Sequence, residues 1–138
     1  MPQPLVCLVG FALWAVLLVM GVGFSRVAQV LAGKKRANEF PSGTQHGGDR
    51  YWRLNRAHLN TVENLPIFAA LVIAGVLLHV SSAAFATLPV VIVGARIVQS
   101  VVHVSSGSVV AVNVRFTAFL TQVVCFAWMG IEILRAHA

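Results

Sequence analysis

The sequence predicts an all-α integral membrane protein, folded as a bundle of four transmembrane helices. Three observations lead to this fold class. First, 58% of the 138 residues are hydrophobic and only 10% are charged, whereas a soluble domain carries about 25% charged residues. Second, the apolar residues form long continuous runs, which favour helices over the alternating strands of a transmembrane barrel. Third, polar residues gather in short segments between these runs. The length leaves room for one domain, residues 1–138.

The first helix is expected at about residues 5–32, because the chain carries no charged side chain from Pro2 to Ser25. About twenty apolar residues are enough to cross the hydrocarbon core of a bilayer. A signal peptide is less favoured, since it would begin with basic residues and have a shorter apolar run. Residues 33–49 contain a proline and several glycines among polar residues, so we predict a loop there.

The second helix is expected at about residues 50–78 and the third at about residues 84–104. Residues 65–95 carry no formal charge, but this run is too long for a single span. The polar segment from His79 to Ser82 divides it. The fourth helix is expected at about residues 109–134, after a turn at residues 105–108. We expect Glu63 to be the only acidic side chain within the spans.

The basic residues predict the orientation in the membrane. Six of the ten Lys and Arg side chains lie close together in the chain: Lys34, Lys35, Arg36, Arg50, Arg53 and Arg56. Basic residues gather on the cytoplasmic side of membrane proteins, so we expect loop 33–49 in the cytoplasm and both termini on the opposite side. The short tails favour a bacterial inner membrane over the endoplasmic reticulum. The aromatic residues of a nucleic-acid platform are not interleaved with these charges, so no nucleic-acid partner is expected.

Polar side chains form stripes along the predicted helices, near their cytoplasmic ends. At about 100° per residue, one stripe on the second helix lies within an arc of about 100°. It consists of Arg53, Arg56, Asn60, Glu63 and Asn64. Arg96, Gln99 and His103 follow an i, i+3, i+7 pattern on the third helix. Arg115 lies one or two turns into the fourth helix, with Gln122 on the same face seven residues on, and Arg26 lies near the end of the first. His58 is expected to face away from the stripe of the second helix.

These stripes have two interpretations. Ionisable side chains within a span cost roughly 2.5–3.5 kcal/mol each on insertion scales, so they need a reason. In the structural interpretation, Glu63 pairs with Arg96, and asparagines and serines hold neighbouring helices together. In the functional interpretation, the surplus of arginines at one membrane face binds an anionic ligand. No cluster of residues has metal-ligand spacing, and Cys7 and Cys125 lie in apolar runs as packed or lipid-facing thiols, so no metal site is predicted.

Two segments resemble a known family. RAHLNTVENLP, residues 56–66, resembles the signature of the MAPEG family, the membrane-associated proteins in eicosanoid and glutathione metabolism. VGARIVQSVVH, residues 93–103, is similar to the third-helix segment of the same family. Within the family, the likeness is greatest to the microsomal glutathione transferases. The loop KKRANEFPSGTQHGG, residues 34–48, resembles the prostaglandin E synthase branch.

The resemblance implies a homotrimer of four-helix subunits that binds glutathione, as a co-substrate, between neighbouring subunits. It assigns glutathione contacts to Arg56, Asn60, Glu63, Arg96, Gln99 and His103. Arg53 and Asn64 lie on the same stripe and complete the predicted binding set. Arg115 matches the family arginine beside the glutathione sulfur and is the predicted catalytic residue. The implied activity is a glutathione transferase or peroxidase that acts on hydrophobic electrophiles or lipid hydroperoxides from the membrane.

The sequence departs from the family pattern at a few positions. Gln99 stands where members often have histidine, His103 stands where many have tyrosine, and Phe119 lies near a tyrosine of the prostaglandin branch. These departures keep open an alternative: a non-catalytic MAPEG-like protein that binds lipids or serves as a scaffold. A small proton-coupled transporter is less favoured, because its only candidate carboxylate, Glu63, is flanked by arginines.

Overall fold

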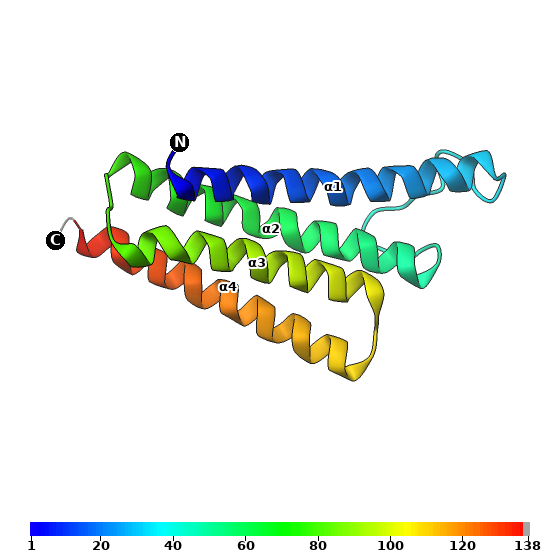
Figure 1. Ribbon diagram of the computed structural model, residues 1–138. Helices are drawn as coiled ribbons and strands as arrows, with labels where there is room; N and C mark the ends of the chain where they lie inside the picture. The colour runs from blue at the N-terminus through cyan, green and yellow to red at the C-terminus, as the bar shows by residue number, and fades with distance from the viewer. Residues whose placement is uncertain (137–138) are drawn as a thin grey trace.

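The chain forms four long α-helices in the computed structural model, which describes residues 1–136 (Figure 1). They are α1 (Gln3–Leu31), α2 (Asp49–Leu77), α3 (Ala83–Ser105) and α4 (Val109–Arg135). Each has 23 to 29 residues and is apolar enough to cross a membrane. At 1.5 Å per residue these helices are about 35–44 Å long, which exceeds the roughly 30 Å hydrocarbon core. The helix limits expected from the sequence lie within two residues of these bounds.

Local signals in the sequence explain where the helices stop and start. His79 follows α2 with a positive φ of 56°, a conformation that histidine adopts more readily than most residues. The Ser82 hydroxyl then accepts a hydrogen bond from the Phe85 N–H at 3.1 Å and caps α3. The Ser108 hydroxyl caps α4 in the same way, through the Ala111 N–H at 3.2 Å. Such caps satisfy N–H groups that have no partner within the helix.

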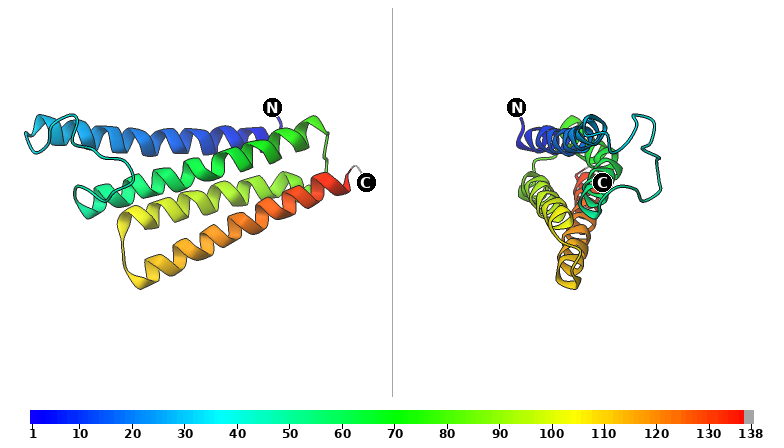
Figure 2. Two further views of the ribbon diagram at one scale, coloured as in Figure 1. Left: turned by 180° about the vertical axis from the view of Figure 1, so that it is seen from behind. Right: turned by 90° about the vertical axis from the view of Figure 1, so that its right-hand side faces the viewer.

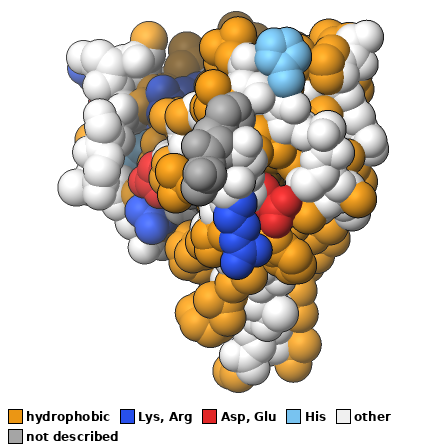
Figure 3. Space-filling view, turned by 90° about the vertical axis from the view of Figure 1, so that its left-hand side faces the viewer, with side chains coloured by type: hydrophobic (Ala, Val, Ile, Leu, Met, Phe, Trp, Pro, Cys, Tyr) orange, Lys and Arg blue, Asp and Glu red, His pale blue; other side chains and the backbone are white. Residues whose placement is uncertain are grey.

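The helices run up and down, so that the first and third connections lie at the same end of the bundle (Figures 1 and 2). Residues 32–48 and 106–108 lie at this end, which we call the loop end, and both chain termini lie at the other, which we call the terminal end. Figure 3 looks onto the terminal end, where hydrophobic side chains lie among other surface atoms and a few basic and acidic groups lie next to each other. The assignment of the loop end to the cytoplasm stays a prediction from the basic residues.

The main hydrophobic core fills the terminal half of the bundle. It consists of Phe11, Phe68, Val72, Phe85, Leu88, Ile92, Cys125, Phe126 and Met129. Phe68 packs against both Phe11 and Phe126, with ring centroids 5.2 Å and 6.1 Å apart. Gly75 allows α2 and α3 to approach closely, because a Cβ at this position would overlap the Phe85 ring. All four helices therefore contribute side chains to the core in this half.

The bundle opens toward the loop end. α4 packs along α3 but meets α2 only over a short stretch, and it diverges from α1 and α2 as it approaches residue 109 (Figures 1 and 2). The space between α2, α3 and α4 therefore widens toward the loop end. The polar stripes described above lie along this wider space and not in the packed half.

One expectation about the spans is wrong. Glu63 is not the only acidic residue within them, because α4 also contains Glu132. Glu132 lies in the last turns of α4 at the terminal end, where its carboxylate accepts a hydrogen bond from the indole N–H of Trp128 at 3.2 Å. A carboxylate near a helix end can reach the membrane interface, which explains why this acid is tolerated in an apolar helix.

Candidate functional site

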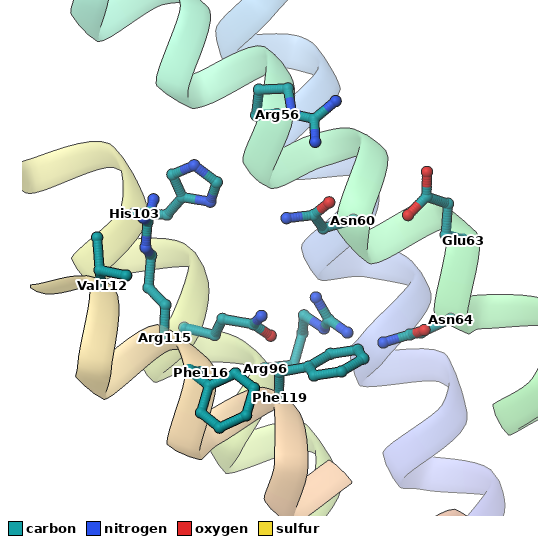
Figure 4. Close-up of a pocket in the computed structure, with 11 residues that line it drawn as sticks. Arg56, Asn60, Glu63, Asn64, Arg96, His103, Val112, Arg115, Phe116 and Phe119 are labelled. Atoms are coloured by element: carbon teal, nitrogen blue, oxygen red, sulfur yellow. The ribbon is translucent and has the colours of Figure 1, made fainter. Parts of the chain in front are cut away.

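A cavity of about 450 Å³ lies between α2, α3 and α4 in the loop half of the bundle (Figure 4). Its size is within the range of about 300–1,000 Å³ that is usual for small-molecule sites. The lining residues are Arg56, Asn60, Glu63, Asn64, Arg96, Gln99, His103, Val112, Arg115, Phe116 and Phe119. The predicted stripes on separate helices thus meet around one space.

The helical spacing of α2 explains its contribution to the cavity. Arg56, Asn60, Glu63 and Asn64 are separated by four, three and one residues, so their side chains share one face of the helix. This face is turned toward the opening beside α4 (Figure 4). α2 remains helical through Pro66, so the polar stripe and the apolar second half belong to one continuous helix.

α4 contributes a cation together with an apolar edge. Arg115 is half-buried and lines the cavity, and so do Val112, Phe116 and Phe119. The two phenylalanines are exposed on the outside of the bundle, 63% and 42% accessible respectively. In a membrane such a surface contacts lipid or another subunit. The cavity therefore joins a cationic interior to an apolar rim.

Arg96 is the most unusual side chain of the site. It is only 1% exposed, yet its Nε and one terminal nitrogen are buried without a hydrogen-bond partner. Its guanidinium lies over the Phe11 ring of α1, 5.6 Å from the centroid. A cation–π contact compensates only part of the cost of burying a charge. Arg96 thus belongs to the cavity wall, and its Nε and one terminal nitrogen are buried there without a hydrogen-bond partner.

The structural interpretation required a direct contact between Glu63 and Arg96. The described residues show no direct ion pair between these two side chains. Glu63 is exposed, and Figure 4 shows its carboxylate pointing away from the Arg96 guanidinium. Three guanidiniums and one carboxylate therefore line the cavity, and they give it two net positive charges.

A glutamine pair fixes the wall between α3 and α4. The side-chain N–H of Gln122 donates to the Gln99 Oε1 at 2.9 Å and also to the Ala118 carbonyl at 2.9 Å. Gln122 is fully buried behind the cavity and does not line it, although the sequence placed it on the same face of the helix as Arg115. Its contact orients Gln99, which does line the cavity.

Arg53 is the member of the predicted binding set that lies outside this cavity in the described structure. Its Nε donates to the Val104 carbonyl at 3.4 Å, near the end of α3. A cation at the C-terminal end of a helix is favourable, because the last carbonyls carry partial negative charge. The structure thus places Arg53 as a link between α2 and α3. His58, expected to face away from the stripe, lines a different cavity between α1 and α2.

The model of the MAPEG family matches residues 4–135, nearly the whole chain. The chain belongs to the MAPEG family. It has no significant match among curated proteins. Family membership and the four long apolar helices together make this MAPEG protein an integral, multi-pass membrane protein. The family includes glutathione transferases and peroxidases as well as members without catalytic activity.

Two features of the MAPEG site could not be found in the sequence. Phe11 is far from the stripes in the chain, and no pattern predicts that its ring lies against Arg96. Val112 has no polar group to mark it as a lining residue. For metals, the described residues contain no group of three or more His, Cys, Asp or Glu side chains placed to hold an ion. Cys7 and Cys125 are free thiols.

Proposed function

We propose that this MAPEG protein is a membrane-bound glutathione transferase or glutathione-dependent peroxidase. The observation that carries this proposal is the buried Arg96, whose guanidinium has unpaired donors at the wall of a cationic cavity. Burying such a group without a partner is costly. An anionic ligand that accepts hydrogen bonds from Arg96 would offset this cost.

Glutathione matches the charge of this cavity. The peptide carries two carboxylates and one ammonium, and its thiolate form therefore has a net charge of −2. The cavity has two net positive charges. Arg56 and Arg96 suit the carboxylates, because a guanidinium can bind both oxygens of a carboxylate at once. Glu63 is the only lining acid and suits the ammonium.

Arg115 is proposed to activate the thiol. An ordinary thiol has a pKa of about 8.5, so only a few per cent is ionised at neutral pH. Lowering this pKa by about two units requires roughly 2.7 kcal/mol of preferential stabilisation of the thiolate. A guanidinium close to the sulfur and partly shielded from water can supply this amount. His103 and Gln99, which also line the cavity, can add a hydrogen bond to the sulfur.

The apolar rim indicates the class of second substrate. Phe116 and Phe119 are exposed on the outer surface of the bundle beside Arg115. A hydrophobic electrophile or a lipid hydroperoxide dissolved in the bilayer would approach along these rings and meet the thiolate. A water-soluble thiol would enter from the loop end. The cavity thus suits one reactant from each phase.

A homotrimer, as the family resemblance implies, would explain the exposed polar groups. Glu63 lies fourteen residues into α2, well within a helix long enough to span the membrane, and its side chain is exposed. A charged group facing lipid at such a position is costly. A neighbouring subunit packed over the open side of the cavity would remove this exposure and would place glutathione between subunits.

The alternative is a MAPEG member that binds a ligand without turnover. The chain contains one tyrosine, Tyr51, and its hydroxyl bonds to Arg26 rather than lining the cavity. No tyrosine hydroxyl is therefore available to the sulfur among the described residues. This observation favours a binding role if the guanidinium of Arg115 alone does not ionise the thiol.

The deciding measurement is the ultraviolet absorbance of the glutathione thiolate, recorded on purified protein in detergent with an Arg115→Ala variant as control. We expect a thiolate signal in the wild type that the variant lacks, while calorimetry shows that both still bind glutathione. Equal thiolate signals in both proteins would remove Arg115 from its role. Binding without any thiolate in the wild type would favour the non-catalytic alternative.

A further inference from the structure

A second cavity, of about 410 Å³, lies at the loop end, away from the cavity of α2, α3 and α4. It is formed where the chain leaves α1 and turns back alongside that helix (Figures 1 and 2). Its walls include Arg26, Val27, Val30 and Leu31 from α1, and Asn38 and Phe40 from the following loop. None of these residues lines the glutathione cavity.

Two cations flank one aromatic ring at this second cavity. The Arg26 guanidinium lies 5.5 Å from the Phe40 ring centroid, and the Lys35 ammonium lies 5.4 Å from it. Arg26 uses its Nε to donate to the Tyr51 hydroxyl at 2.9 Å. Within residues 1–136, the terminal nitrogens of Arg26 have no hydrogen-bond partner, so they can still bind an anion.

Neither cation forms an ion pair with an acid among the described residues, and the Lys35 ammonium donates to the Glu39 backbone carbonyl at 3.5 Å. The Glu39 carboxylate accepts the Arg36 backbone N–H at 2.9 Å and lies 4.0 Å from the Arg36 Nε. Glu39 is not among the residues that line the cavity. The site therefore keeps a positive charge, from Arg26 in its wall and Lys35 beside it.

The other wall of the site is apolar and faces outward. Val27 and Leu31 are 55% and 83% exposed. Arg26 lies five residues before the end of α1, and α1 is longer than the hydrocarbon core, so this last stretch falls at the boundary between acyl chains and headgroups. A cation with an apolar wall below it, at this depth, matches the chemistry of an amphiphile with an anionic head.

We propose that this cavity binds the phosphate headgroup of an anionic membrane lipid. Arg26 binds the phosphate from the cavity wall, and Lys35, which contacts the Phe40 ring beside the cavity, adds positive charge near it. Val27 and Leu31 contact the first part of the acyl chain. The exposed apolar wall favours a lipid over a free phosphate ion, which would leave that wall without a partner. The site does not require glutathione to bind elsewhere in the protein.

The test uses the full-length protein in bilayer nanodiscs that contain equal amounts of phosphatidylglycerol and phosphatidylcholine. Native mass spectrometry measures which lipid stays bound after release from the disc. We expect the wild type to retain phosphatidylglycerol preferentially, and Arg26→Gln to reduce this preference about fivefold, as is typical for one basic residue near a membrane surface. Lys35→Gln, in the loop, should reduce it without disturbing α1.

Two variants serve as controls. Arg135→Gln removes one positive charge at the terminal end and should leave the preference unchanged. Tyr51→Phe removes the hydrogen bond to Arg26 but keeps the guanidinium, so it separates a folding effect from loss of the charge. Equal retention of both lipids by the wild type, or an unchanged preference in both Arg26→Gln and Lys35→Gln, would overturn the proposal. Displacement of the lipid by millimolar inorganic phosphate would instead identify a free-anion site and also overturn it.

Discussion

The two halves of the bundle are built on opposite principles. In the terminal half, aromatic and aliphatic side chains from all four helices fill the interior, and Gly75 brings α2 and α3 together over Phe85. In the loop half, α4 diverges from α2, and arginines and amides surround an open cavity. The terminal half is closely packed, while the loop half contains the buried Arg96 guanidinium without hydrogen-bond partners.

This difference separates tight packing from unpaired polar groups along the length of the same helices. Membrane helices associate through close van der Waals packing and interhelical hydrogen bonds, because lipid offers no hydrophobic driving force between them. The terminal half supplies that packing. The loop half is then able to hold unpaired polar groups that would otherwise separate the helices. Substitutions in the two halves should therefore change different measured quantities.

The largest effect is expected from Phe126→Ala in the terminal half. Phe126 is 8% exposed and packs against Phe68, and truncating a buried phenylalanine typically costs about 3–5 kcal/mol. The melting temperature in detergent should fall strongly, whereas glutathione affinity of the protein that remains folded should change little. A large loss of affinity without a loss of stability would contradict the division between the halves.

Arg96→Met should have the opposite pattern. The variant loses the buried donors proposed to bind a carboxylate, and removing one partner of such a pair costs about 2–5 kcal/mol, so glutathione binding should weaken roughly a hundredfold. Stability without ligand should not fall, because an unpaired buried charge is replaced by an apolar side chain of similar length. Calorimetric titration and thermal melting of the same sample measure both. A clear drop in ligand-free melting temperature would show that Arg96 is structural.

Phe11→Leu should have a smaller effect. It changes a core residue but should lower glutathione affinity in the other half. The Phe11 ring belongs to the core and also lies 5.6 Å from the Arg96 guanidinium. Loss of a cation–π contact is worth about 0.5–2 kcal/mol, so glutathione affinity should fall several-fold through displacement of Arg96. The same substitution in Arg96→Met should cause no further loss of affinity. An equal loss in both backgrounds would remove Phe11 from this positioning role.

Arg53→Gln should have the smallest effect. Its Nε contacts the Val104 carbonyl at a long 3.4 Å, and it does not line the cavity. Half-exposed polar contacts of this kind contribute about 0–1 kcal/mol, so the melting temperature should fall by only a few degrees and glutathione affinity by about twofold at most. A tenfold loss of affinity would return Arg53 to the binding set predicted from the sequence.

The sequence predicted the helices well because its signals are local. Continuous apolar runs mark the spans, and His79 and the capping serines Ser82 and Ser108 mark their limits. Helical periodicity also grouped the residues on each polar face, and eight of the nine predicted site residues line one cavity. Their role in binding and catalysis stays a prediction.

Periodicity could not show which face meets which neighbouring helix. It suggested Glu63 as a partner for Arg96, but the two side chains point in different directions across the cavity (Figure 4). It placed Gln122 on the same face of its helix as Arg115, but it could not show that Gln122 donates a hydrogen bond to Gln99 on α3. Contacts such as these depend on how the helices pack, and packing is set by side chains distant in the sequence.

The unpaired guanidinium of Arg96 also has a thermodynamic consequence. A ligand that binds only the folded protein raises its apparent stability by mass action, by about 2.7 kcal/mol at a concentration one hundred times its dissociation constant. An anion that accepts hydrogen bonds from Arg96 would therefore stabilise the folded protein. Persistence of the protein in the membrane would then follow the supply of that anion, so that each molecule lasts longest where the anion is abundant.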